Sequence, residues 1–279
     1  MAEIKKILIA NRGEIVQRAI RTIKEMGKKS VAVYSSGDKN ASSLKHADEA
    51  VCIGGAKSSE SYLNIPALIT AAEMTGCDAI FPGYGFLSEN QDFVEICKLH
   101  NIKFIGPSSE VMEKMADKSK AKEEMVRAGV PVVPGSKGAV RTLDEGKKIA
   151  REIGYPIMAK ASAGGGGRGM RLIKEEKDFD SQYLAASSEA LAAFGDGTMY
   201  LERFINNPRH IEVQVIGDSH GNAIHIGERD CSLQRRHQKV IEESPAILLN
   251  DETRAKLHEV AVKATKYLKY EGAGTFEFL

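Results

Sequence analysis

Four consecutive glycines make residues 160–170, KASAGGGGRGM, the segment most suited to chemistry. Glycine leaves backbone N–H groups unobstructed, so such a loop can fold over phosphate oxygens. Lys160 ends a predicted strand just before the loop, and Lys118 lies on an earlier helix; either ammonium could neutralise phosphate charge. Most glycine clusters are instead hairpin tips, and a single lysine is typical of a solvated surface. The combination favours phosphate binding.

Two common nucleotide motifs do not account for this loop. Gly164, Gly166 and Gly169 formally satisfy G-x-G-x-x-G, but residues 168–173 alternate like a strand, whereas a dinucleotide fingerprint opens a helix. The sequence also contains no G-x-x-x-x-G-K-[ST], H-E-x-x-H, G-x-S-x-G or EF-hand loop. The loop is therefore not predicted to be a dinucleotide or Walker-type site.

A second segment, residues 228–239, concentrates positive charge in an otherwise neutral chain. It carries four basic residues against two acidic ones, with His237 able to add to the excess. Such a cluster is where an anion would bind. The alternative is a solvated run balanced by Glu242 and Glu243. Cys231 lacks an evident catalytic partner other than His237, so we interpret it as a packing residue.

Glu277 alternates with Phe276 and Phe278 in an apolar stretch that predicts a strand. A carboxylate on a buried strand needs a cationic partner, because an unpaired buried charge is costly. Mg²⁺ shared with nucleotide phosphates is one candidate partner, and an arginine is another.

The elements that position these residues begin with alternating strands and helices, which predict an α/β unit with a parallel sheet. Its expected strands are residues 7–10, 30–34, 78–81 and 102–105, and its helices 14–26, 62–74 and 93–99. A helix over 109–128 follows. The prolines and glycine of residues 130–135, VPVVPG, then exclude a helix and indicate a domain junction.

Beyond the junction a smaller mixed region is expected, followed by antiparallel sheet. Its predicted helices are 143–153 and 181–194 and its strands 157–160, 170–173 and 199–204. A hairpin of 211–216 with 222–228, a helix over 251–267 capped by Asn250 or Asp251, and a strand at the end of the chain complete the interpretation. A domain rarely ends on an unprotected strand, so we expect further chain downstream. We divide the sequence into an N-terminal α/β domain (1–114), linker helices (115–134), a lid subdomain (135–204) and an incomplete C-terminal subdomain (205–279).

Composition excludes several classes of protein. The 279 residues are 42% hydrophobic and 28% charged, which excludes disordered and collagenous chains. With 39 Lys+Arg against 38 Asp+Glu, the formal charge is +1, so no global field attracts nucleic acid or a membrane surface. Four scattered cysteines, and an N-terminus without a signal-like apolar region, predict a cytoplasmic protein without membrane spans.

Taken in order, the motifs closely resemble those of biotin carboxylase, the ATP-grasp component of biotin-dependent carboxylases. The resemblance covers the whole chain and rests on IANRGEI (9–15), FPGYGFLSEN (81–90), FIGP (104–107), DK (117–118), the glycine loop, NPRHIE (207–212) and residues 228–239. It implies an ATP-grasp fold, mixed α/β and α+β, with an N-terminal Rossmann-like parallel-sheet domain. It also implies carboxylation of biotin by bicarbonate and ATP through carboxyphosphate.

The resemblance also implies roles for single residues. Lys118 and Lys160 would hold ATP phosphates, and Gly166 and Gly167 would close as a lid that excludes water. Adenine would meet the run Glu202, Arg203, Phe204 and Ile205, partly through main-chain groups, and the nucleotide site would be lined by His210, Gln234 and His237. Lys239 would contact bicarbonate and the reacting phosphate, and Glu277 would be the first carboxylate ligand of Mg²⁺ or Mn²⁺.

The family implies partners as well: a biotin carboxyl carrier protein with its biotin, carboxyltransferase subunits and a homodimer, with no nucleic acid. Family members continue past this strand into a Glu-x-Asn-x-Arg stretch with further active-site groups, which the 279 residues lack. We therefore expect these residues alone to bind ATP weakly and to carboxylate little. Two alternatives stay open: another ATP-grasp ligase with an acyl-phosphate intermediate, such as the carbamoyl-phosphate synthetase class, and a nucleotide-binding scaffold without activity.

Overall fold

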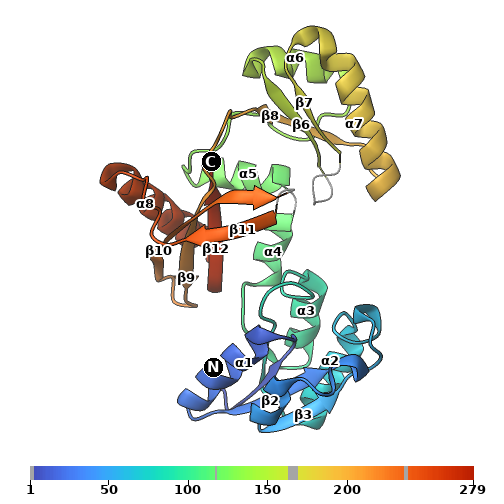
Figure 1. The fold of residues 1–279 in the computed structure, drawn as a ribbon, viewed down its shortest axis with the longest axis vertical. Helices are drawn as coiled ribbons and strands as arrows, with labels where there is room; N and C mark the ends of the chain where they lie inside the picture. Colours follow the sequence, from blue (N-terminus) through green and yellow to red (C-terminus); the bar gives the residue numbers. More distant parts are fainter. Residues whose placement is uncertain (1–2, 117, 163–168, 236–237) are drawn as a thin grey trace. The chain divides into compact units, whose positions relative to one another are not determined.

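A computed structural model of the chain describes residues 3–116, 118–162, 169–235 and 238–279, without the side chains of residues 118–120. The chain forms two compact units, Met1–Glu113 and Lys114–Leu279. Each unit has its own sheet or sheets (Figure 1). Each also has its own hydrophobic cores. Among the described helices, none has the length and apolar character needed to span a membrane.

Five parallel strands form the sheet of the first unit in the order β3-β2-β1-β4-β5. Side chains of β1 alternate between two cores, with Leu8 in one and Ile7 and Ile9 in the other. Such burial on both faces is typical of a parallel sheet covered by helices, so the predicted α/β unit is confirmed. The strands are β1 (Lys6–Ile9), β2 (Lys29–Tyr34), β3 (Glu49–Cys52), β4 (Ala79–Phe81) and β5 (Lys103–Phe104).

Helices cover both faces of this sheet. Helix α1 (Glu14–Glu25) packs into the core that holds Ile7 and Ile9, whereas α2 (Ile65–Met74) and α3 (Gln91–Leu99) pack into the core that holds Leu8. Helix α2 begins later than predicted because the Asn64 side chain caps it, accepting a hydrogen bond from the Ala67 N–H at 3.1 Å. Short 3₁₀ turns at Ser36–Asp38, Ser42–His46 and Ser58–Glu60 complete the connections.

The helix predicted over 109–128 is helical at the residues that the structure describes, as α4 (Ser109–Ala116) and α5 (Lys118–Arg127), with residue 117 outside the described part. After α5 the chain turns at Gly129, whose φ of 69° is readily adopted only by glycine. Ala128 and Val130 then pack against Ala264 of the last helix, so the end of α5 belongs to the core of the second unit.

The middle of the second unit is a small three-stranded antiparallel sheet in the order β7-β6-β8. Helices α6 (Leu143–Ile153) and α7 (Phe179–Phe194), the latter preceded by a 3₁₀ turn at Glu176–Asp178, share one core with one face of this sheet. Its strands are β6 (Ile157–Ala161), β7 (Met170–Ile173) and β8 (Met199–Arg203).

The second sheet of this unit has four antiparallel strands in the order β11-β10-β9-β12. Val213 and Val215 of β9 pack against Ala261 of α8 (Asp251–Leu268), which covers one face of the sheet. Asn250 caps α8 by accepting a hydrogen bond from the Thr253 N–H at 2.8 Å, as predicted. The strands are β9 (Ile211–Gly217), β10 (Ala223–Arg235), β11 (Gln238–Glu243) and β12 (Gly272–Phe278), and the predicted hairpin and final strand are confirmed.

Candidate functional site

The face of the four-stranded sheet opposite α8 carries a row of paired charges. Side chains alternate along a strand, so when Val213 of β9 points at α8, Glu212 points to the opposite face. Glu212 lies directly across from Arg229 of β10 on one side and from Glu277 of β12 on the other. The register thus places two carboxylates and a guanidinium side by side.

Glu212 is the buried centre of this row. Its side chain is only 4% exposed, and its two oxygens accept hydrogen bonds from Arg229 Nε and Lys239 Nζ. Burial raises the pKa of Glu212, but the two donors and their charges outweigh burial, and the pKa is lowered overall. The carboxylate therefore stays ionised and holds both cations.

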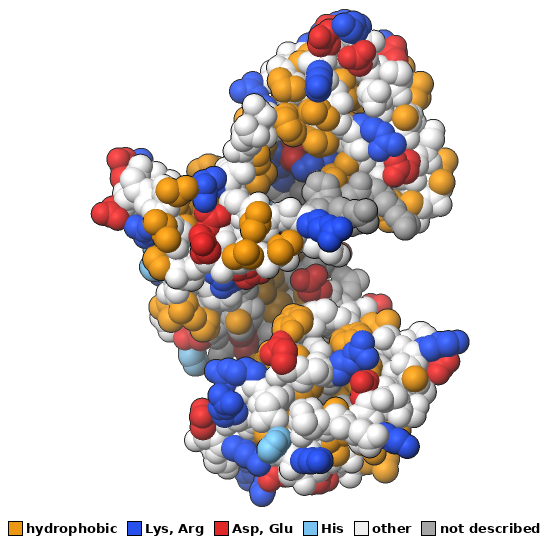
Figure 2. Space-filling model, in the orientation of Figure 1, with side chains coloured by type: hydrophobic (Ala, Val, Ile, Leu, Met, Phe, Trp, Pro, Cys, Tyr) orange, Lys and Arg blue, Asp and Glu red, His pale blue; other side chains and the backbone are white. Residues whose placement is uncertain are grey.

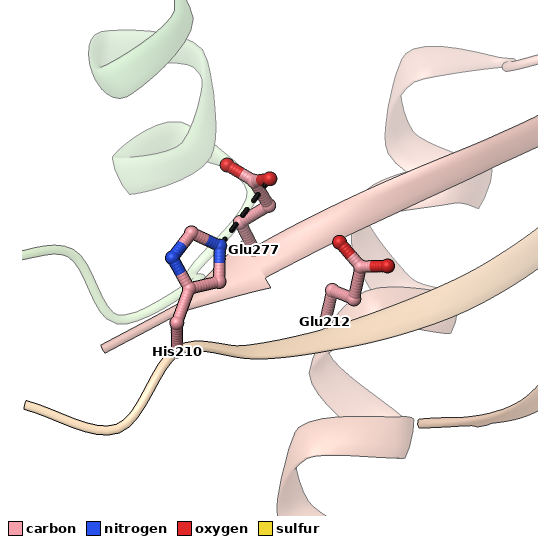
Figure 3. Close-up of side chains that lie close together, drawn as sticks. All are labelled: His210, Glu212 and Glu277. Carbon is pink, nitrogen blue, oxygen red and sulfur yellow. Dashed lines mark ion pairs between the residues drawn. The ribbon is translucent and has the colours of Figure 1, made fainter. Parts of the chain in front are cut away.

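Lys239 links Glu212 to Glu277, whose Oε1 lies 2.9 Å from the lysine Nζ. Burial alone would lower the pKa of Lys239, but its two carboxylate partners raise the pKa well above the usual value. His210 Nε2 lies 3.3 Å from the same Glu277 oxygen (Figure 3). His210 Nδ1 lies 2.9 Å from Gln234 Nε2. Four of the sequence-predicted residues, His210, Gln234, Lys239 and Glu277, are thus brought together.

The same cluster has a donor set that fits a divalent cation. Ligand atoms of His210, Glu212 and Glu277 lie within 4.8 Å of one another, and carboxylate oxygens are the ligands that Mg²⁺ prefers. His210 Nε2 is buried and makes no hydrogen bond within the described part of the chain, although it lies 3.3 Å from Glu277 Oε1. This nitrogen and the exposed Glu277 carboxylate face each other, as two ligands of one cation would.

A second pair of predicted residues meets on the three-stranded sheet. Lys160 of β6 and Glu202 of β8 form an ion pair, with side-chain exposures of 26% and 15%. Both lie on the face of the sheet that points away from the core shared with α6 and α7, where Ala159 and Leu201 are buried. In this structure the Lys160 ammonium is therefore matched by a carboxylate.

The run after β8 uses part of its backbone within the protein. The N–H of Arg203 donates to Pro134 O at 2.8 Å, and the N–H of Phe204 donates to Pro156 O at 3.0 Å. The Arg203 guanidinium donates to the Ile153 carbonyl. Within the described residues the N–H of Ile205 has no such acceptor. A main-chain contact to adenine from this run would thus come from Ile205 or from carbonyl groups.

Several predicted residues lie outside the described part of the chain. These are Gly166, Gly167, His237 and the side chain of Lys118. The backbone of Lys118 begins α5.

The sequence prediction missed Glu212, which is the main counter-charge of the basic segment. The sequence offers Glu242 and Glu243 as balancing residues, but Arg229 Nε lies 3.7 Å from Glu242 and bonds more closely to Glu212. Arg229 and Lys239 are therefore not free anion-binding cations in this structure. A signal was present, because Glu212 is a charged residue at a polar position of the alternating strand 211–215, as Glu277 is between Phe276 and Phe278.

Cys231 is fully buried, which confirms its interpretation as a packing residue. Burial raises the pKa of its thiol to about 11, so little thiolate exists at neutral pH. Basic and acidic side chains are interspersed on the face shown in Figure 2, in line with the near-zero net charge.

Comparison with known families matches both parts of the chain. Residues 3–112 match the family described as "Biotin carboxylase, N-terminal domain", and residues 117–279 match "Carbamoyl-phosphate synthase L chain, ATP binding domain". Among similar proteins, biotin carboxylase of Nostoc sp. is 56% identical over 98% of this chain and 61% of the relative. Biotin carboxylase 1 of Bacillus subtilis is 50% identical over 99% of this chain and 61% of the relative.

Solved structures agree with these matches. The biotin carboxylase–β,γ-ATP complex from Campylobacter jejuni is similar with a TM-score of 0.93 and 70% identity, over 99% of this chain and 62% of that one. The biotin carboxylase domain dimer of Hydrogenobacter thermophilus 2-oxoglutarate carboxylase, with MgADP, ADP and bicarbonate, has a TM-score of 0.90 and 50% identity. This match covers 100% of our chain and 61% of that domain. The chain thus spans about three fifths of the length of its relatives, and the predicted ATP-grasp fold is confirmed.

Proposed function

The chain belongs to the biotin carboxylase family, and from this premise we propose that it takes part in the ATP-dependent carboxylation of biotin by bicarbonate. The observation that carries the proposal is the array of Lys239, Glu212, Glu277 and His210 on one sheet face. The Lys239 ammonium could bind an anion, and the neighbouring Glu212 and Glu277 carboxylates could bind a cation beside it. The Hydrogenobacter relative, whose structure contains MgADP and bicarbonate, supports the same assignment.

The proposed chemistry activates bicarbonate, which is a poor electrophile. A bicarbonate oxygen attacks the γ-phosphorus of ATP, the bond from that phosphorus to the β-bridging oxygen breaks, and ADP leaves. The product, carboxyphosphate, releases CO₂ and phosphate; the phosphate takes the proton of the biotin ureido nitrogen, and this nitrogen attacks the CO₂. Lys239 is proposed to offset the charge of bicarbonate and of the transferring phosphoryl group. For this its ammonium must be shared between substrate and the two glutamates.

Glu277 is proposed to hold Mg²⁺ or Mn²⁺, which when bound offsets phosphate charge. His210 and Gln234 line the nucleotide site in this proposal, together with His237. Lys118 and Lys160 contact the phosphates, and Gly166 and Gly167 close over them. Adenine lies against the run Glu202 to Ile205, where main-chain groups bind it.

The partners are also proposals. We propose that the biotin is attached to a carrier protein, that carboxyltransferase subunits use the carboxylated product, and that the chain forms homodimers, as the Hydrogenobacter domain does. A cytoplasmic location is supported by four unpaired cysteines. Residues 1–279 span about three fifths of the length of the relatives. We therefore propose that these residues contribute nucleotide binding and that full activity needs groups outside them.

Calorimetry with MgATP tests the nucleotide part of the proposal. The double variant Lys118→Met with Lys160→Met is expected to weaken binding at least about 100-fold, since each charge-assisted contact contributes roughly 1.5–3 kcal/mol. Lys177→Met removes an exposed lysine and should leave the affinity unchanged. Unaltered affinity in the double variant would contradict the proposed phosphate-binding role of the two lysines.

A second assay measures phosphate release by a chain of the relatives' full length. Release that is stimulated by biotin, depends on bicarbonate and needs no ammonia separates this function from carbamoyl-phosphate synthesis and from binding alone.

A further inference from the structure

Helix α5 presents a lysine, Lys122, that has no role in the function proposed above. It lies one helical turn after Lys118, at the start of the second unit. Its side chain is half-buried and contacts Tyr200 of β8 in two ways. The ammonium donates to the Tyr200 hydroxyl, and it lies 4.7 Å from the centre of the tyrosine ring. This contact joins α5 to the three-stranded sheet.

The lysine is enclosed by backbone as well as by the ring. Gly135 lies over the contact, because a Cβ added there would be 2.7 Å from Lys122 Nζ and 2.7 Å from the Tyr200 hydroxyl. Tyr200 itself is 4% exposed. A lysine ammonium is rarely buried this far from water unless a nearby charge or hydrogen-bond acceptor compensates for its lost hydration.

That nearby charge is the carboxylate of Glu202. Tyr200 lies directly opposite Lys160 in the β6–β8 register, and Glu202, two residues further along β8, is on the same face. Burial lowers the pKa of Lys122; the carboxylate of Glu202 acts in the opposite direction, and the ammonium of Lys160 adds to the lowering. One carboxylate thus acts on two lysines, of which only Lys160 is bonded to it.

This arrangement has a consequence for nucleotide binding if the Lys160 ammonium binds a phosphate. In the structure Lys160 is committed to Glu202, and a phosphate that draws its ammonium away would leave a half-buried carboxylate without a partner. Removing one partner of such a pair is costly because the remaining charge stays desolvated. A second cation near Glu202 would reduce that cost.

We propose that Lys122 is a positioning residue that balances the charge of Glu202 when Lys160 turns to the phosphates of a nucleoside triphosphate. This inference rests on the proposed nucleotide site. Lys122 does not contact the nucleotide; it acts through Glu202. Loss of Lys122 therefore makes recruitment of Lys160 more costly, whereas loss of the Glu202 charge makes Lys122 dispensable.

Calorimetric titration of MgATP into wild type, Lys122→Met, Glu202→Gln and the double variant tests the coupling. We expect Lys122→Met to weaken binding about tenfold, which is 1.4 kcal/mol, and the double variant to bind within about twofold of Glu202→Gln. Lys122→Arg keeps the charge and should bind nearly as wild type, and Lys177→Met controls for a general loss of charge. If Lys122→Met unfolds, Lys122→Gln replaces it. An equal loss in both backgrounds overturns the proposal in favour of direct contact or simple packing, and so does an unchanged affinity in Lys122→Met.

A second measurement does not depend on nucleotide. The pKa of Lys122, followed by NMR titration of ¹³C-labelled lysine, should fall further in Glu202→Gln than in wild type. An unchanged pKa overturns the coupling even if MgATP binds normally. If wild type binds no MgATP, the proposed function fails, and the NMR titration alone decides whether Lys122 and Glu202 are coupled.

Discussion

Lys239 and Glu277 lie on the two opposite edge strands of the four-stranded sheet, β11 and β12, yet their charged groups meet at 2.9 Å. Lys239 reaches across β10 to Glu212 of β9, which is paired directly with Glu277 of β12. An ammonium held between two carboxylates from different strands is fixed in position by three backbone segments. The strand register of the sheet therefore determines where Lys239 would meet an anion.

Glu277→Gln tests the proposed cation site. The substitution removes one carboxylate from the group of His210, Glu212 and Glu277 and one partner from Lys239. We expect the affinity for Mg²⁺ in the presence of ATP to fall about 10- to 100-fold, the range seen when a metal site loses a supporting group. Titration of Mg²⁺ by calorimetry at fixed ATP measures this. Glu259→Gln, an exposed carboxylate on α8, should bind Mg²⁺ as wild type does.

Glu212→Gln should destabilise the second unit strongly. The side chain is 4% exposed and neutralises Arg229 and Lys239, so its loss leaves Arg229 with only the more distant Glu242, and Lys239 with only Glu277, as an acidic partner among the described residues. We expect the free energy of unfolding to fall by about 3 kcal/mol, the size reported for breaking a buried pair. Urea denaturation measures the change. Glu242→Gln is the matched control, because Glu242 is 45% exposed and 3.7 Å from Arg229, and its effect should stay within about 0.5 kcal/mol.

The sequence predicted the alternating core elements well, because their burial is recorded in apolar periodicity. It missed β3 (Glu49–Cys52), whose residues are exposed or half-buried and whose pairing with β2 is the only reason for an extended conformation. It also treated β11 (Gln238–Glu243) as a charged segment, since all six residues are exposed. Strands that owe their existence to backbone pairing with a neighbour leave little trace in their own composition.

For the candidate site, the sequence predicted which residues take part but not which of them contact one another. Motif order singled out His210, Gln234, Lys239 and Glu277, and the structure brings these four together. The role of Glu212 depends on β9 lying between β10 and β12, a relationship between segments up to 65 residues apart that no local pattern contains. Likewise, the approach of Lys122 to Tyr200 joins residues 78 positions apart.

Acid should unfold the second unit partly through Glu228, which is 2% exposed. Burial raises its pKa, but hydrogen bonds from Arg254 at 2.8 Å and from His258, with one from the Ala246 N–H, lower the pKa below the ordinary value of 4.5. A carboxyl group with a lowered pKa in the folded state contributes stability fully above pH 4.5 and loses it as the pH falls through the folded value.

The unfolding free energy of wild type should therefore decline below this pH, and Glu228→Gln should be less stable at pH 7 but flatter in the acid range. Urea denaturation at several pH values measures both effects. Glu252→Gln, an exposed variant at the start of α8, should keep the wild-type slope. A Glu228→Gln curve parallel to wild type would contradict the assignment.

Gly135→Ala tests the close packing at the junction before the three-stranded sheet. An alanine Cβ at this position would lie 2.5 Å from the Leu201 carbonyl oxygen, which is backbone and cannot move alone. The segment around Gly135 is held there by the Ser136 N–H, which donates to the same carbonyl at 2.7 Å. We expect a loss of about 1–3 kcal/mol in the free energy of unfolding, typical of overpacking.

Gly138→Ala, three residues later, is the control. A Cβ added there has no atom within 4 Å, so the free energy of unfolding should stay within about 0.5 kcal/mol of wild type. Equal effects of the two substitutions in urea denaturation would show that the contact with the Leu201 carbonyl adds no cost of its own.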